Sequence, residues 1–180
     1  MSTKRASTTM PDRLNEIGVY RRREIEARIL APFVEALGKH LSPEQVLQIL
    51  RDVVAQLARQ QGRQLAKTQG NTLADFARSL ADWQKGDAMQ FEFLEQSPGC
   101  LSYNATRCRY AELYKSLGLT ELGQILSCSR DEPLLEGFNP QISFVRSQTI
   151  LEGAPFCDFR LVLKPAKKKR SRTKQPRHQP

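Results

Sequence analysis

Cysteines are the chemistry-bearing residues that stand out in this sequence of 180 residues. Cys108, Cys128 and Cys157 each fall at the expected boundary of a helix or strand, beside polar residues. Cys108 begins an expected helix between two arginines, and the helix macrodipole and the flanking charges both favour its thiolate form. The separations of 20 and 29 residues do not fit a zinc ribbon, so spacing alone gives weak support for a metal site. Burial as small apolar side chains is the commoner outcome for cysteines, and Cys100 is expected to be incidental.

Histidine chemistry is excluded. The chain has two histidines, of which His178 lies in a basic tail and His40 at the end of an expected helix. Neither a histidine-containing triad nor a His-rich metal site can therefore form. The sequence also lacks the P-loop, GxSxG, HExxH and GxGxxG motifs. Acid–base work must come from carboxylates, thiols, tyrosines or lysines.

Two further polar residues are candidates for binding a substrate. Asn139 precedes Pro140, and this turn can present a side-chain amide, although turn formation alone also accounts for the pair. Arg146 shares a face of an expected strand with Ile142 and Phe144. Arg146 either reaches solvent at the strand end or points into a pocket as a bidentate clamp for a substrate carboxylate.

The elements that must position these residues begin with helices. Apolar residues recur at helical spacing over residues 12–39, with the RRRE segment at 21–24 expected on the outer face. Pro32 should kink or split this stretch. A capping box with proline at the first helical position starts a second helix over residues 42–65, and a third is expected over residues 72–86.

Beyond residue 87 the hydrophobic period changes from that of helices to that of strands. Strands are expected as a hairpin over residues 88–106 and singly over 141–150 and 156–163, with helices over 108–117 and 120–126 and a loop over 129–140. Helices followed by a mostly antiparallel sheet with two short inserted helices give an α+β fold. We expect one domain over residues 11–163, helical over 12–86 and sheet-rich over 87–163.

The charge is concentrated at the ends of the chain. The net charge is +9, yet residues 11–163 carry a net charge of only −1. A near-neutral body argues against a folded nucleic-acid-binding face. Residues 1–10 and the basic tail 164–180 are expected to be disordered. The tail is either a solubilising extension or a non-specific contact for nucleic acid and other polyanions.

No apolar run approaches the roughly 20 residues that cross a bilayer, and no apolar segment follows the basic residues near the N-terminus. We therefore expect neither a membrane span nor a secretory signal. A cytoplasmic protein with reduced thiols is the prediction.

Several short motifs follow one another in the second half of the chain. They are Asn104-x-x-x-Cys108-x-Tyr110-Ala111-x-x-Tyr114, Leu117-Gly118-Leu119, Cys128-x-x-Asp131, Gly137-Phe138-Asn139-Pro140, Arg146-x-x-Thr149 and Gly153-x-x-x-Cys157-Asp158-Phe159-Arg160. In this order they resemble the L-2-amino-thiazoline-4-carboxylic acid hydrolase family. The resemblance covers residues 73–163 well and the N-terminal helices loosely.

The resemblance implies a hydrolase that opens a cyclic amidine-like ring bearing a carboxylate and gives a carbamoyl-cysteine. Water must add to the carbon between sulfur and nitrogen, a base must take its proton, and an acid or cation must stabilise the departing heteroatom. We expect Asp131 or Asp158 to be the base and Arg146 to hold the substrate carboxylate. Asn139 and Tyr110 are the expected hydrogen-bond donors.

The resemblance also implies that the three thiols act together around one cavity, and it leaves them two functions. Cys108 or Cys157 is the nucleophile of a covalent intermediate, or Cys108, Cys128 and Cys157 bind a divalent metal such as zinc that activates water. The alternative to a hydrolase of a small molecule is a non-catalytic metal- or redox-sensing cysteine module whose tail binds polyanions. The oligomeric state is left open.

Overall fold

The structure is a computed structural model that describes residues 17–165. Its helical first half comprises α1 (Val19–Leu37), α2 (Pro43–Gln69), α3 (Leu73–Ser79), α4 (Ala81–Gln84) and the 3-10 turn η2 (Lys85–Asp87). Its second half comprises β1 (Met89–Gln96), β2 (Cys100–Cys108), α5 (Arg109–Ser116), α6 (Thr120–Leu126), the 3-10 turn η3 (Cys128–Arg130), α7 (Asp131–Phe138), β3 (Ile142–Val145) and β4 (Cys157–Leu163). The predicted α+β class is confirmed.

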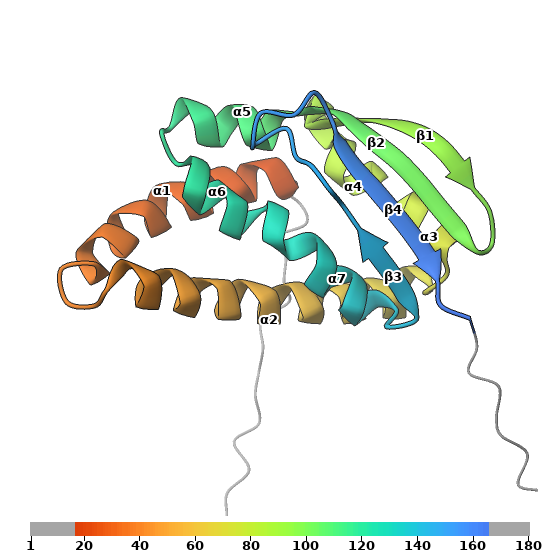
Figure 1. Cartoon of the computed structure of the whole chain (residues 1–180), viewed down its shortest axis with the longest axis horizontal. Helices are drawn as coiled ribbons and strands as arrows, with labels where there is room; N and C mark the ends of the chain where they lie inside the picture. The colour runs from red at the N-terminus through yellow and green to blue at the C-terminus, as the bar shows by residue number, and fades with distance from the viewer. Residues whose placement is uncertain (1–16, 166–180) are drawn as a thin grey trace, which may run out of the picture.

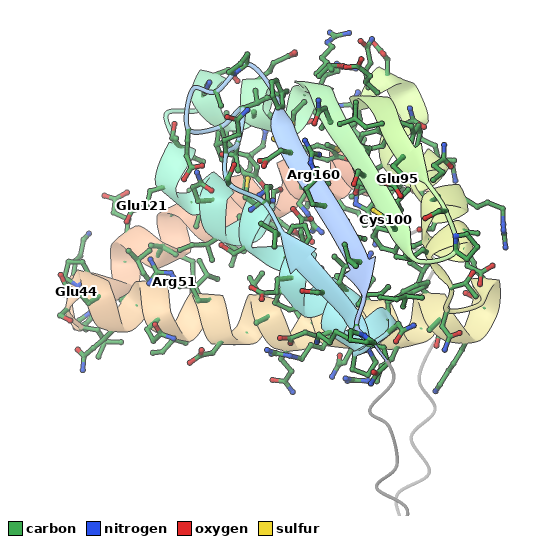
Figure 2. The ribbon with its side chains drawn as sticks, turned by 45° about the vertical axis from the view of Figure 1, so that its right-hand side comes forward. Glu44, Arg51, Glu95, Cys100, Glu121 and Arg160 are labelled. Carbon is green, nitrogen blue, oxygen red and sulfur yellow. The ribbon has the colours of Figure 1, made fainter. Side chains whose placement is uncertain are left out.

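The strands form one antiparallel sheet in the order β1-β2-β4-β3. Figure 2 shows the strands in front of the helices, and in Figure 1 the long α2 runs along the base of the molecule with α7 beside it. Along β4 the side chains of Cys157, Phe159 and Leu161 are buried, whereas those between them are more exposed. One face of the sheet therefore packs on the helices, as strand alternation requires.

Two apolar clusters fill the interior. The first joins α2, α3 and α7 to the sheet and includes Phe76, Tyr103 and Phe138. The second lies among α1, α2, α5 and α6 and includes Tyr114 and Leu126. The cavity described below is lined from both clusters.

Helix α7 occupies a segment that was predicted to be a loop, and that prediction was wrong. The acidic residues Asp131 and Glu132 stand in its first turn, where they suit the helix dipole. Pro133 is tolerated there because the first amide groups of a helix have no intrahelical partner. Leu134, Leu135 and Phe138 are then buried.

Helices α2 and α7 approach each other closely at two glycines. A Cβ atom at Gly62 would overlap the Leu134 backbone, and one at Gly137 would overlap the backbone of Arg59. Because glycine has only a hydrogen atom as its side chain, the backbones of α2 and α7 can approach this closely. The crossing fixes where α7 begins, and with it the position of Asp131.

Helix α1 continues through Pro32, so the split that was one expectation for this position does not occur. Its orientation is also not the expected one, because Arg23 is buried with 5% of its surface exposed, while Ile25, Ile29 and Phe33 are exposed. The placement of Arg23 on the outer face was therefore wrong.

The strand predicted over residues 141–150 is shorter than expected. Strand β3 ends at Val145, and Arg146 begins the connection to β4. None of the helices within residues 17–165 combines the length and apolar character of a membrane span. The expectations for residues 1–10 and for the tail, apart from Lys164 and Pro165, lie outside the described part of the chain.

Candidate functional site

A cavity of about 90 Å³ lies where the two apolar clusters meet. That volume admits several water-sized groups and hence the body of a small ligand. Most of the wall is apolar and aromatic. Among the described residues, the charged groups on the wall are Asp131 and the arginines Arg23, Arg130 and Arg146.

The structure brings three cysteines to this one cavity. Cys108 ends β2, Cys128 begins η3 and Cys157 begins β4, and all three line the wall. Cys157 also accepts a hydrogen bond from the backbone amide of Ile150 at 3.2 Å. Cys100, at the other end of β2, does not line the cavity.

The Cys108 thiol is protonated at neutral pH, contrary to the thiolate predicted from its flanking arginines and helix start. Burial raises the pKa of Cys108 to about 11, and the lowering effects of the Ala111 and Tyr110 backbone amides do not offset it. The side chains of the two neighbouring arginines make their hydrogen bonds and ion pairs with groups other than the Cys108 thiol. Arg107 pairs with acidic side chains, and Arg109 donates to the Gly86 carbonyl at 2.8 Å.

The other two thiols are also held in the neutral form. Burial raises the pKa of Cys128, with the charge of Asp131 adding to the rise, and burial raises the pKa of Cys157. Within residues 17–165 there is no group of three or more His, Cys, Asp or Glu side chains arranged to hold a metal ion. Without such a cluster, the described side chains give no support to the zinc site that was one prediction for the three thiols.

Asp131 and Arg146 form an ion pair at the cavity wall. The Arg146 guanidinium donates to the Asp131 carboxylate, and its second terminal nitrogen donates to the Cys128 carbonyl at 3.1 Å. Burial raises the pKa of Asp131 to about 6, against the lowering effect of Arg146. Asp131 is therefore mostly ionised at neutral pH and is still basic enough to accept a proton.

Tyr110 lines the cavity, as a hydrogen-bond donor to a ligand would need to do. Its hydroxyl lies 3.5 Å from the Trp83 carbonyl oxygen and donates to it. Burial raises the pKa of Tyr110, so its hydroxyl keeps its proton.

Asp158 is not brought to the cavity. Its carboxylate accepts hydrogen bonds from the Ser147 amide and hydroxyl at 2.9 and 2.8 Å and from the Gln148 amide at 2.9 Å. Burial opposes its ionisation, but these hydrogen bonds outweigh burial and lower its pKa. Asp158 thus anchors the connection that carries Arg146.

Asn139 also lies away from the cavity. Its side-chain amide donates to the Asn71 carbonyl at 2.9 Å, and its side-chain oxygen accepts from the Gln141 amide at 2.9 Å. The amide nitrogen therefore joins the end of α7 to the α2–α3 connection, and the side-chain oxygen closes the turn that precedes β3. Of the two interpretations given for Asn139 from the sequence, this arrangement corresponds to turn formation alone.

Arg23 and Arg130 on the cavity wall were not among the residues singled out from the sequence. The helical pattern placed Arg23 on the outer face. Arg130 occupies one of the unspecified positions of the Cys128-x-x-Asp131 motif. Its position directly before Asp131 was the sequence feature that could have identified it as a site residue. Gln61 on α2, also missed, accepts a hydrogen bond from Arg130 at 3.0 Å.

A comparison with known protein families identifies a match over most of the chain. The model of the L-2-amino-thiazoline-4-carboxylic acid hydrolase family matches residues 22–161. This stretch contains the three cavity cysteines, Asp131 and all three cavity arginines. The sequence matches no curated protein.

Proposed function

The chain belongs to the L-2-amino-thiazoline-4-carboxylic acid hydrolase family, and on this premise we propose that it hydrolyses a small cyclic amidine-like ring that carries a carboxylate. The 2-amino-thiazoline-4-carboxylate ring is the substrate type, and a carbamoyl-cysteine is the product. One observation carries the proposal: a half-buried carboxylate of raised pKa and a set of arginines share a cavity of about 90 Å³. A cytoplasmic location belongs to the same proposal.

In the proposed reaction, Asp131 is the general base. Its ionised carboxylate takes a proton from water while the water oxygen bonds to the ring carbon between sulfur and nitrogen. This addition converts the C=N double bond of the ring into a single bond. The bond from that carbon to a ring heteroatom then breaks as the added hydroxyl becomes the carbonyl. The proton held by Asp131 passes to the departing atom, and the hydroxyl proton passes to the ring nitrogen. Substrate and one water become one product, and the carboxylate is regenerated.

Arg146 is the positioning residue for this base. Its ion pair with Asp131 orients the carboxylate, and its hydrogen bond to the Cys128 carbonyl fixes the guanidinium. Because two of its terminal nitrogens are already engaged, Arg146 has less capacity to clamp the substrate carboxylate as well. This role differs from the clamp expected from the sequence.

The thiols of Cys108 and Cys157 shape the cavity in this proposal. The thiolate is the nucleophilic form of cysteine, and burial disfavours that form at both positions. Their neutral state supports direct attack by water over a covalent intermediate. A metal-activated water has no support from the side chains of residues 17–165.

The test is incubation of the purified chain with 2-amino-thiazoline-4-carboxylate and mass-spectrometric detection of a product heavier by one water. Wild-type protein is expected to form it, and Asp131→Asn to lose at least about a hundredfold in turnover while staying folded. Glu132→Gln is the matched control, because Glu132 is the exposed neighbour of Asp131 and lies off the cavity wall. Folded wild-type protein that hydrolyses no cyclic amidine would overturn the proposal.

A further inference from the structure

Two arginines converge on the cavity from separate parts of the chain. Arg23 comes from α1 and Arg130 from η3, and both line the wall. Arg23 is more than nine-tenths buried. Both residues face the same cavity, and the positive charge of Arg23 opposes that of Arg130, while the charges of Glu26 and Asp131 partly offset it. Burial together with that like charge lowers the pKa of Arg130 to about 10.

The positive charge of this pair is incompletely balanced by the protein. Arg23 pairs with Glu26, whose side chain is 38% exposed. Arg130 donates to the neutral amide oxygen of Gln61, and no carboxylate within residues 17–165 lies within ion-pair distance of it. Asp131 is engaged by Arg146. Because the half-buried Arg130 guanidinium has no carboxylate at ion-pair distance within residues 17–165, an anionic ligand in this cavity would stabilise its charge.

We propose that Arg23 and Arg130 together form the carboxylate-binding site of the cavity. Guanidinium groups bind carboxylates through paired, charge-assisted hydrogen bonds, and a mostly apolar cavity strengthens them. The identity of the ring rests on the function proposed above, whereas the negative charge of the ligand rests on the arginine pair.

The position of the pair suits the chemistry. Arg130 directly precedes Asp131 in the chain, and both side chains line one cavity. A carboxylate held by Arg130 therefore keeps a small ring within reach of Asp131, which lowers the entropic cost of the reaction. Arg23 and Arg130 thus bind the anionic group of the ligand, whereas Arg146 positions the base Asp131.

The experiment measures the affinity of the full chain for thiazole-4-carboxylate and for the uncharged thiazole-4-carboxamide by calorimetry. Wild-type protein is expected to bind the carboxylate more tightly. Arg130→Gln and Arg23→Gln are each expected to reduce that preference at least about tenfold, and to raise KM more than they lower kcat. Arg28→Gln is the matched control, because Arg28 is an exposed arginine of α1.

The outcomes separate this inference from the proposed hydrolysis. A carboxylate preference that depends on both arginines, in a protein that opens no ring, leaves the inference standing and refutes the hydrolysis. Ring opening with an unchanged carboxylate preference in folded Arg130→Gln overturns the inference. Should Arg23→Gln not fold, Arg23→Lys, which keeps the charge and loses the planar fork, must still weaken carboxylate binding, and unchanged binding would count against a role for Arg23.

Discussion

Arg146 and Asp131 lie 15 residues apart in the chain and pair directly at the wall of the cavity. Asp131 is the first residue of α7, and Arg146 directly follows the last residue of β3. The pair therefore links the helical layer to the sheet at the point where the chemistry is proposed. The Arg146 guanidinium also lies 5.6 Å from the centre of the Phe159 ring. This second contact adds a cation–π attraction to the hydrogen bonds that hold the guanidinium.

The first prediction concerns the pH dependence of turnover. A general base must be ionised, and burial raises the pKa of Asp131 to about 6. We therefore expect kcat/KM to be level above that pH, to fall as pH drops through it, and then to fall about tenfold per pH unit. The measurement is kcat/KM from about pH 4.5 to 8, with circular dichroism at each pH to show that the fold persists. A level profile throughout would contradict Asp131 as the base.

The second prediction concerns Arg146→Gln. Arg146 lowers the pKa of Asp131, so its removal should let that pKa rise further. The acid limb of the pH profile should then move to higher pH by roughly one unit or more, and kcat at neutral pH should fall.

A clamp on the substrate carboxylate predicts something else for the same variant: a raised KM with the acid limb unchanged. Measuring the full profile of Arg146→Gln beside wild type distinguishes the two roles. An unmoved limb would contradict the positioning role. An unmoved KM would contradict the clamp that the sequence suggested.

The third prediction concerns the thiols. Cys108→Ser and Cys157→Ser place a hydroxyl in the cavity wall and should each reduce turnover by about tenfold. Cys100→Ser should have little effect, because Cys100 lies off the cavity, toward the hairpin end of the sheet in Figure 2. A loss above about a thousandfold in Cys108→Ser or Cys157→Ser, together with a covalent adduct on the wild-type protein, would instead identify a nucleophile.

The fold was largely predictable because its local signals agree with its tertiary structure. The capping boxes at Ser42 and Thr72 start α2 and α3 as expected. The strand predicted over residues 156–163 forms β4, which begins one residue later, at Cys157. Such signals depend on neighbours along the chain and need no knowledge of distant contacts.

The site was less predictable, because its charged residues contradict the patterns used to place them. Helical periodicity assigns arginines to the solvent face, yet α1 buries Arg23 and exposes Ile29 and Phe33. Likewise, flanking arginines suggested a thiolate at Cys108, although burial dominates its pKa. In both cases the cavity determines the result: it sets the burial of Arg23 and the pKa of Cys108. The cavity is formed by residues far apart in the chain, so no short stretch of sequence reveals it.

The last prediction concerns the crossing of α2 and α7. Gly62→Ala should destabilise the protein by about 1–3 kcal/mol, because the added methyl group meets the Leu134 backbone and cannot be absorbed by a rotamer change. The melting temperature should fall by about 2–4 °C per kcal/mol. Gly99→Ala is the matched control, since a Cβ at Gly99 meets nothing within 4 Å.

The same substitution also tests how the site is positioned. Gly62 follows Gln61, which accepts a hydrogen bond from Arg130, and α7 begins at Asp131. Moving α7 away from α2 should therefore shift Arg130 and Asp131 together and lower turnover even at temperatures where Gly62→Ala is fully folded. Full turnover in a folded but destabilised Gly62→Ala would mean that the crossing supports the fold without setting the geometry of the site.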